Sequence, residues 1–199
     1  MKVIEDKLLD VIKNALKSEH ESLLELPKER FSNSLETGIF HLPEKVLVYV
    51  IYKKLLQSTS FRGLSKNWED WYSQSSRLRK RHKYVDLMIT DMKSGMRWDF
   101  IECGWYTPKK VEGDYKKLKD YEGDEVNDKY LVLFRRRTKK EEKLDTLIEQ
   151  TLSDKNIREC KCVCSCRSFL WEDYPIYNKD WKKTGSEPRV FEIALFKID

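Results

Sequence analysis

The sequence predicts a mixed α/β domain in which helices pack on a central β-sheet. Several segments carry apolar residues at steps of three and four, as amphipathic helices do, and others carry them in alternation or in short continuous runs, as strands do. These segments follow the order helix, helix, strand, strand, helix, strand, helix, strand, strand. A sheet covered by helices accommodates this order better than a bundle or a barrel does.

The first half of the chain opens with helices. Apolar residues from Val3 to Leu16 recur at helical spacing, and Pro43 opens a second helix that we expect to reach Gln57. Ser58–Lys83 has no clear period and is interpreted as irregular. The pattern then switches to period two over Tyr84–Ile89, which indicates a strand.

The following elements are predicted from turn, cap and burial signals. Asp91–Gly95 is a turn-forming stretch and Met96–Trp105 a second strand, so the two strands form a hairpin. Thr107 and Pro108 are typical of an N-cap and first helical position, and this helix should end near Tyr121–Gly123. Further along come a strand buried on both faces, a helix and two strands, at Tyr130–Phe134, Leu144–Leu152, Cys160–Leu170 and Val190–Ile198.

The composition excludes several classes of protein. Of 199 residues, 40% are hydrophobic and 37% charged, with only 7 Gly and 5 Pro, so the chain is neither disordered nor collagen-like. The net charge of +5 permits a polyanionic partner without demanding one. We expect a single domain over 1–199, with an N-terminal helical region at 1–41, a core at 42–137 and a C-terminal helix and strands at 138–199.

No stretch approaches the roughly 20 apolar residues of a membrane span. Met1–Leu16 mixes acidic with apolar residues and lacks the apolar core and cleavage site of a signal peptide. Cysteines crowd into 160–166, which is unlike a secreted disulfide framework. These features predict a cytoplasmic protein without membrane contact. The alternating cysteines favour buried thiols in a strand, with a zinc or redox site as the alternative: Cys160, Cys162, Cys164 and Cys166.

Two acidic residues fall in the predicted hairpin. Asp86 interrupts the apolar residues of the first strand, and Glu102 lies at the equivalent depth of the second, on the same face as Phe100. A carboxylate buried among aromatic residues is costly without a partner. A Mg²⁺ or Mn²⁺ ion is a suitable partner, because these cations bind carboxylate oxygens, water and phosphate.

The order of a helix with an acid, a strand with Asp, a strand with Glu, a helix and a buried strand resembles the PD-(D/E)XK nuclease superfamily over about Leu42–Phe134. The resemblance implies a restriction-endonuclease-like fold, with a mixed central sheet flanked by helices. It also implies a hydrolase that cuts phosphodiester bonds of DNA or RNA with Mg²⁺ or Mn²⁺ as cofactor. On this basis Glu44, Asp86 and Glu102 are expected to be catalytic and to bind the metal.

The family usually places a lysine two residues after the second acid, where this chain has Gly104. Lys117 in the following helix is expected to supply that lysine, in an arrangement similar to that of the cap-snatching endonucleases of segmented negative-strand viruses, and Lys109 and Lys110 are rival donors. Those enzymes also use an early histidine, a position that His41 would fill as a further metal ligand. The alternative function is a catalytically inactive nuclease-like domain that serves as a nucleic-acid or protein binding module or as a scaffold subunit.

Simpler structural explanations compete for some of these residues. An acid at Glu44 is favoured by the helix dipole alone, and Lys117 belongs to the polar face of its helix. Glu102 can also pair with a neighbouring basic residue.

A nucleic acid, DNA or RNA, is the expected partner, with a protein partner or a homodimer as the alternative. Basic residues just before the Asp86 strand, with Trp68–Tyr72 upstream, are typical of a surface that follows a phosphate backbone, or of a solvated loop. Aromatic-rich stretches at Trp68–Tyr72 and Trp171–Trp181 would instead suit a protein interface. The expected nucleic-acid-binding residues are Arg77, Arg79, Lys80, Arg81, Lys83, Lys109 and Lys110.

Overall fold

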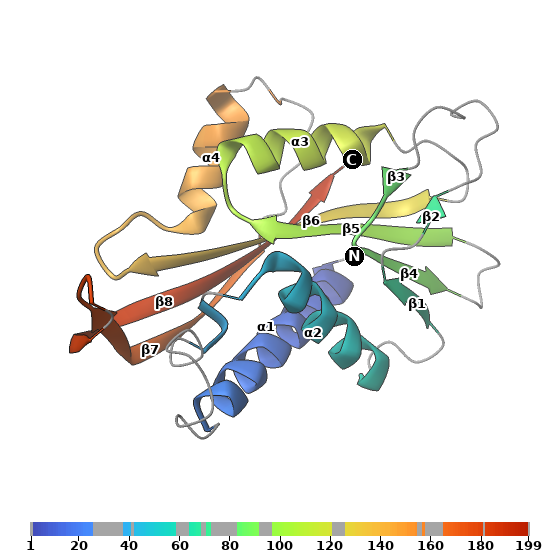
Figure 1. Ribbon diagram of the computed structural model, residues 1–199. Coiled ribbons are helices and arrows are strands. Elements are labelled where there is room, and N and C mark those ends of the chain that lie inside the picture. Colours follow the sequence, from blue (N-terminus) through green and yellow to red (C-terminus); the bar gives the residue numbers. More distant parts are fainter. Residues whose placement is uncertain are drawn as a thin grey trace.

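The computed structural model describes residues 2–25, 38–40, 42–58, 64–68, 71–72, 83–91, 97–120, 126–154, 157, 165–180 and 182–198. Within these ranges, helices pack on a six-stranded mixed sheet, and two short strands pair separately (Figure 1). The predicted mixed α/β class is therefore confirmed. None of the helices in the described ranges has the length and apolar character that crossing a membrane requires.

The helices are α1 (Lys2–Glu25), α2 (Glu44–Gln57), α3 (Pro108–Lys119) and α4 (Leu144–Asp154). The strands are β1 (Leu64–Trp68), β2 (Trp71–Tyr72), β3 (Lys83–Tyr84), β4 (Leu87–Asp91), β5 (Arg97–Trp105), β6 (Val126–Thr138), β7 (Ser165–Tyr177) and β8 (Lys183–Ile198). The main sheet has the order β1-β4-β5-β6-β8-β7. In it β5 and β6 run parallel, and every other neighbouring pair is antiparallel.

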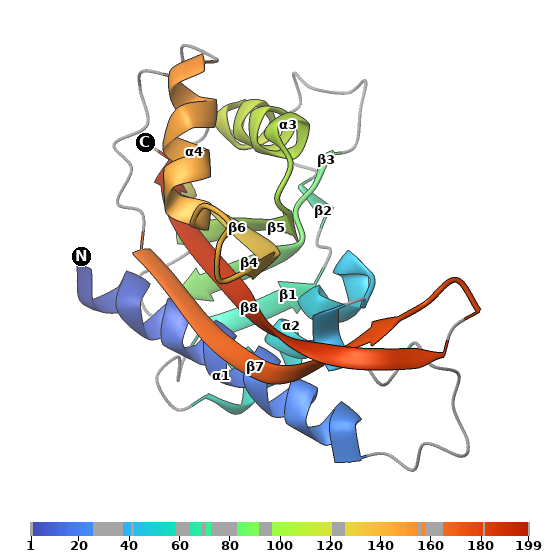
Figure 2. The same ribbon diagram turned by 90° about the vertical axis from the view of Figure 1, so that its left-hand side faces the viewer.

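The helices divide between the two faces of the sheet. Helices α1 and α2 cover one face and α3 and α4 the other, as the two views show (Figures 1 and 2). The buried apolar residues accordingly form two clusters, one on each face. Strand β6 contributes to both, because Tyr130, Val132 and Phe134 pack in the first cluster and Leu131 and Leu133 in the second. Its continuous apolar run is explained by burial on both faces, as predicted.

Several local predictions are confirmed. Helix α2 begins at Glu44, directly after Pro43. Helix α3 begins at Pro108, and the Oγ1 of Thr107 accepts the backbone N–H of Lys110 at 3.0 Å, which caps the first turn. Strands β4 and β5 form the expected antiparallel pair.

The strand expected over Tyr84–Ile89 is interrupted. Strand β3 ends at Tyr84, the chain bends at Asp86, and β4 begins at Leu87. Val85 therefore packs in the cluster under α3 and α4, whereas Leu87 packs in the opposite one. The Asp86 carboxylate accepts a backbone N–H of β5. This bond takes the place of the backbone hydrogen bond that Asp86 would make in a regular strand, which explains the bend.

The segment expected to be irregular, Ser58–Lys83, contains strands. Strand β1 pairs with β4 from Leu64 to Trp68 and forms an edge of the main sheet, and β2 pairs with β3. Sheet pairing uses backbone groups, so these short strands form without the alternating pattern that the prediction required.

The C-terminal strands are longer than predicted. Strands β7 and β8 form a long hairpin that projects past the helices (Figure 2). The inner half of β8, Val190–Ile198, is buried, while Lys183–Ser186 at the tip is exposed. Backbone pairing therefore continues beyond the apolar segment. The strand expected from Cys160 begins at Ser165 among the described residues, where Cys166 is half-buried. Cys160, Cys162 and Cys164 lie outside the described residues.

Candidate functional site

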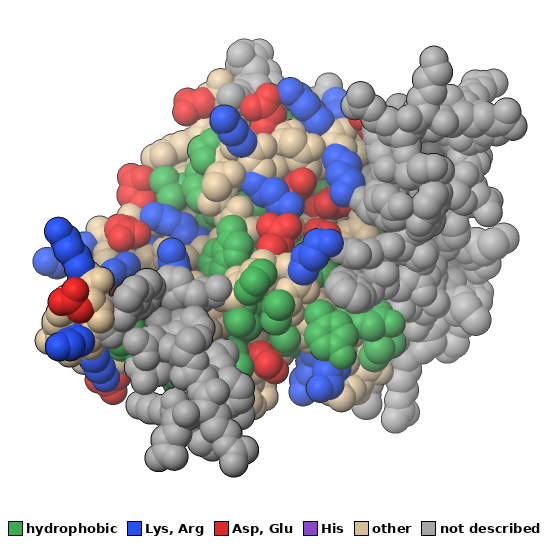
Figure 3. All heavy atoms as spheres, viewed as in Figure 1, with side chains coloured by type: hydrophobic (Ala, Val, Ile, Leu, Met, Phe, Trp, Pro, Cys, Tyr) green, Lys and Arg blue, Asp and Glu red, His purple; other side chains and the backbone are tan. Residues whose placement is uncertain are grey.

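Charged side chains from four parts of the chain meet beside the C-terminal half of β5. Glu44 begins α2, Asp86 lies in the bend before β4, Glu102 lies within β5 and Lys117 on α3. Figure 3 shows acidic and basic side chains gathered on this side of the molecule, between α3 and α2. We call this group, together with Lys110 and Asp114 of α3, the charged cluster.

Asp86 is fixed by the neighbouring strand. Its Oδ2 accepts the backbone N–H of Cys103 at 2.7 Å, so the carboxylate lies next to the residue that follows Glu102. The hairpin register agrees with this placement, because Leu87 pairs with Ile101. Burial raises the pKa of Asp86, and the Cys103 N–H and the ammonium groups of α3 oppose that shift.

Glu102 is the most deeply buried acid of the cluster, with 2% of its surface exposed. Its Oε1 lies 2.5 Å from the Nζ of Lys117. Burial raises the pKa of Glu102 to about 8, assisted by the negative charge of Asp86, although Lys117 opposes the shift. This carboxyl group therefore keeps its proton to a higher pH than an ordinary glutamate does.

Lys110 joins two further acids. Its Nζ lies 3.1 Å from Oε1 of Glu44 and 3.0 Å from Oδ2 of Asp114. The other oxygen of Glu44 accepts the backbone N–H of Trp105 at 3.3 Å. Burial alone would lower the pKa of Lys110, but the carboxylates of Asp114 and Glu44 outweigh burial and raise it. This lysine therefore stays charged at any physiological pH.

Gly104 makes room for Lys110. A Cβ at this position would lie 2.1 Å from Cε of Lys110 and 2.7 Å from Oε2 of Glu44. The Lys110 side chain thus fills the space into which a residue at 104 would extend. Two lysines of α3 therefore lie beside this part of β5, since Lys117 contacts Glu102 and Lys110 occupies the space beside Gly104.

The helix spacing explains which side chains of α3 reach the cluster. Lys110, Asp114 and Lys117 recur at steps of four and three, so they share one face, while Val111 and Leu118 of the adjacent face are buried in the core. Asp114 pairs with Lys110. The spacing of four residues between Lys110 and Asp114 was the signal that favoured this pair.

The charge balance and the donor atoms suit a divalent cation. The charged cluster holds four carboxyl groups and two ammonium groups, so the acids outnumber their lysine partners. Carboxylate oxygens are the donors that Mg²⁺ and Mn²⁺ take. With the side chains as they lie, no three His, Cys, Asp or Glu residues in the described ranges form a group that could hold a metal ion. Lys110 and Lys117 contact the carboxylates instead, and a cation would have to displace an ammonium group.

Other predicted residues lie away from the cluster or beyond the described ranges. Lys109 is exposed on α3, whereas Lys110 is drawn into the cluster by its ion pairs. The backbone of Lys83 belongs to β3. His41, Arg77, Arg79, Lys80 and Arg81 lie outside the described residues.

Comparisons of this chain with protein-family models, with curated proteins and with solved structures find no match.

The contact between Gly104 and Lys110 predicts a measurable coupling. Gly104→Ala should lower the free energy of unfolding by about 1–2 kcal/mol, because the new methyl group displaces the Lys110 ammonium from Glu44. Urea denaturation should show that the loss shrinks when Lys110→Ala is already present. Gly113→Ala is the control, since no atom lies within 4 Å of its added Cβ and α3 should gain about 0.5–1 kcal/mol. Equal stability of Gly104→Ala and the wild type would contradict the coupling.

Proposed function

We propose that this protein is a divalent-metal-dependent nuclease that hydrolyses phosphodiester bonds of DNA or RNA. The observation that carries the proposal is the convergence of Glu44, Asp86, Glu102 and Lys117, which come from separate elements and meet at one place. Buried acids with raised pKa values that converge from separate elements are typical of functional sites.

The order of elements around the cluster supports a restriction-endonuclease-like arrangement. One acid begins α2, a second lies in the bend before β4 and a third lies on β5, and β5 connects through α3 to the parallel strand β6. This connection packs α3 against the sheet, so its charged face lies over Glu102 of β5.

Each residue has a distinct part in the proposed reaction. Asp86 and Glu102 would hold a Mg²⁺ or Mn²⁺ ion, with Glu44 beside them. Such an ion, when bound, polarises the phosphate and lowers the pKa of a water molecule. Lys117, which contacts Glu102, would face the phosphate once Glu102 held the cation instead. Lys117 and Lys110 would stabilise negative charge that develops on the phosphate oxygens.

A second candidate function is an inactive nuclease-like module that binds nucleic acid or protein. The observation that favours it is that three of the four acids already contact a lysine, since Lys110 contacts Glu44 and Asp114 and Lys117 contacts Glu102. In such a module the ammonium groups permanently replace the metal, and the cluster is a structural network.

A metal titration separates the two functions. Mn²⁺ and Mg²⁺ at millimolar concentration should raise the melting temperature of the wild type by several degrees, because a cation that binds only the folded state stabilises it. Asp86→Asn and Glu102→Gln should show no such rise. Asp173→Asn removes an exposed carboxylate of β7 and should respond like the wild type. A wild type that responds to neither ion would favour the inactive module.

A further inference from the structure

The β7–β8 hairpin continues well beyond the core of the domain. Its paired residues reach Tyr177 and Lys183, whereas the buried part of β8 begins only at Val190. Figure 2 shows the outer part projecting past the helices, and we call its described residues, 176–180 and 182–186, the arm. A two-stranded ribbon is marginally stable by itself. Since most of the arm is exposed, burial of apolar surface does not explain its length.

The turn at the end of the arm is held by hydrogen bonds. Oδ1 of Asn178 accepts the backbone N–H of Asp180 at 3.0 Å and that of Lys182 at 2.9 Å. The Asn178 N–H donates to the Lys182 carbonyl at 3.0 Å, and the Thr184 hydroxyl donates to the Ile176 carbonyl at 3.2 Å. These bonds join both sides of the turn, so the arm is ordered before any partner binds.

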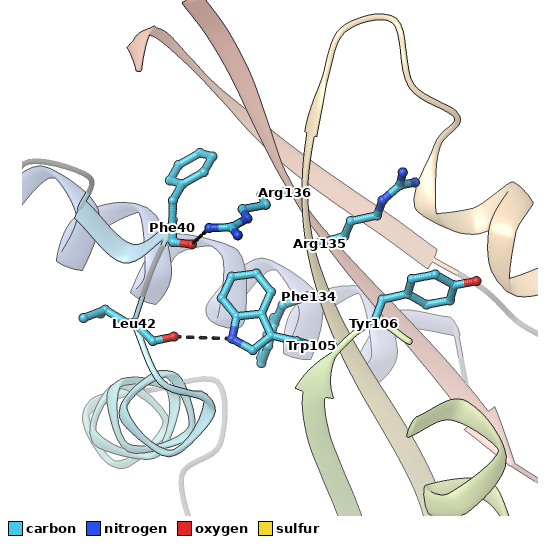
Figure 4. A pocket seen from close by; sticks show the side chains of 7 residues that line it. All are labelled: Phe40, Leu42, Trp105, Tyr106, Phe134, Arg135 and Arg136. Atoms are coloured by element: carbon cyan, nitrogen blue, oxygen red, sulfur yellow. Dashed lines mark hydrogen bonds between the residues drawn. The ribbon is translucent and has the colours of Figure 1, made fainter. Parts of the chain in front are cut away.

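The root of the arm is fixed to the body of the domain. Arg136 lies on β6 beside β8, and its Nη1 donates to the Phe40 carbonyl at 3.1 Å (Figure 4). Phe40 packs on Tyr174 of β7, with their ring centroids 5.5 Å apart. A cavity of about 430 Å³ lies between this root and Trp105, at the end of β5 (Figure 4). The arm therefore extends from a rigid base.

The arm projects from the end of the sheet at which the charged cluster lies. Trp105, the last residue of β5, pairs with Phe134 of β6, and Phe134 pairs with Ile193 of β8. Strand β8 begins ten positions before Ile193, at Lys183. At roughly 3.3 Å per residue, the arm reaches up to about 30 Å beyond the cluster. Both are visible in the view of Figure 3.

The end of the arm is basic. Lys179 lies just after β7, and Lys182 and Lys183 lie at the start of the returning strand. All three side chains are exposed, and Asp180 is the one acid among the described residues of the arm. Lysines in this number favour a polyanion, because each one that contacts a phosphate releases a counterion from the nucleic acid.

Duplex DNA matches a rigid arm better than a single strand does. Two contacts about 30 Å apart reinforce each other when one ligand spans them at little cost in freedom. Duplex DNA is stiff over about 50 nm and covers 30 Å in about nine base pairs, whereas a flexible single strand must be ordered over the same length. The major groove of DNA also admits a two-stranded ribbon, while that of duplex RNA is too narrow.

We infer that the arm binds the phosphate backbone of duplex DNA, up to about nine base pairs from the bond that the charged cluster cuts. Lys179, Lys182 and Lys183 contact the phosphates. This inference rests on the proposed function, which places the scissile bond at the cluster, and it names duplex DNA as the substrate class.

The arm is tested by DNA binding in EDTA, where metal-dependent cleavage does not occur. Fluorescence anisotropy measures the affinity for a labelled DNA duplex of about 30 base pairs. The triple variant Lys179→Gln, Lys182→Gln, Lys183→Gln should bind it roughly tenfold more weakly, and the slope of log affinity against log salt should fall by about 2 to 3. Affinities for single-stranded DNA, duplex RNA and a DNA hairpin of about 8 base pairs should change by less than about twofold.

A second triple variant removes the same charge elsewhere. Lys7→Gln, Lys17→Gln and Lys116→Gln lie at exposed positions of α1 and α3. This control should bind the long duplex within about twofold of the wild type. Both triple variants should keep the wild-type melting temperature, because none of the substituted side chains is buried. An equal loss of affinity in the control would mean that net charge, rather than the arm, attracts DNA, and would overturn the inference.

Other outcomes separate this inference from the proposed function. Equal losses for duplex and single-stranded DNA would overturn it, as would binding to phosphatidylserine vesicles that depends on the three arm lysines while duplex binding does not. A protein that cuts DNA, but whose arm variant binds the duplex normally, would retain the function and lose the arm. A protein that cuts nothing, but whose arm variant loses duplex binding, would retain the arm and lose the function.

Discussion

Asp86→Asn is expected to reduce metal-dependent cleavage of nucleic acid by roughly 10³-fold. Asparagine has nearly the same shape, and its amide oxygen can still accept the Cys103 N–H, so the bend before β4 should persist. What is lost is the negative charge that would hold a divalent cation. The measurement is cleavage of labelled single-stranded and double-stranded DNA and RNA with Mn²⁺, Mg²⁺ or EDTA.

Two comparisons make this result specific. Asp173→Asn removes an acid at an exposed position of β7 and should cleave at the wild-type rate. Asp86→Asn should still bind nucleic acid in a gel-shift assay, because the substitution removes a negative charge and leaves the basic residues in place. If Asp86→Asn cleaves as fast as the wild type, the carboxylate has no part in the reaction and the proposed function is wrong.

The second large effect is a dependence of stability on pH that comes from Glu102. Its pKa is near 8 in the folded protein, against an ordinary value of 4.5 in the unfolded chain. The folded state therefore keeps this proton over a pH range in which the unfolded state releases it. Stability from this group is fully present below about pH 4.5 and is lost as the pH rises toward 8.

The expected loss from Glu102 is on the order of a few kcal/mol across that window. Glu102→Gln cannot ionise, so its free energy of unfolding should fall less between pH 5 and 8 than that of the wild type. Urea denaturation in EDTA at several pH values measures both curves. Parallel curves for the two proteins would show that Glu102 titrates normally in the folded state.

Cation binding should stabilise the folded protein more as the pH rises. A metal ion needs the ionised carboxylate, so it competes with the proton on Glu102. The rise in melting temperature caused by Mn²⁺ should therefore increase from pH 6 to pH 8. A rise that is independent of pH would mean that the cation binds elsewhere.

Local sequence patterns predicted the parts of the fold that depend on local chemistry. Thr107 and Pro108 predicted the start of α3 because an N-cap and a first-turn proline act within one turn. Tyr130–Phe134 predicted a strand buried on both faces because a continuous apolar run of strand length suits that location. The short strands β1 and β2 escaped prediction because their partners, rather than their own residues, make them strands.

The sequence also identified acids that the structure brings together. Asp86 and Glu102 were conspicuous because acids are rare among apolar strand residues. It placed Asp86 within a strand, however, whereas the residue lies in a bend. The reason is a hydrogen bond to Cys103, a residue that only the pairing of β4 with β5 brings near.

By itself, then, the sequence determined the α/β class and the β4–β5 pair, because both depend on periodicity. It also determined the acids near the adjoining ends of these strands, because burying a charge is costly. Only the tertiary structure decided which lysines face those acids. Lys110 reaches Glu44 through the space left by Gly104, which depends on how α3 packs over β5. The cavity around Trp105 likewise joins residues from 40 to 136 of the chain. Such sites arise from packing between distant segments, and no local spacing encodes them.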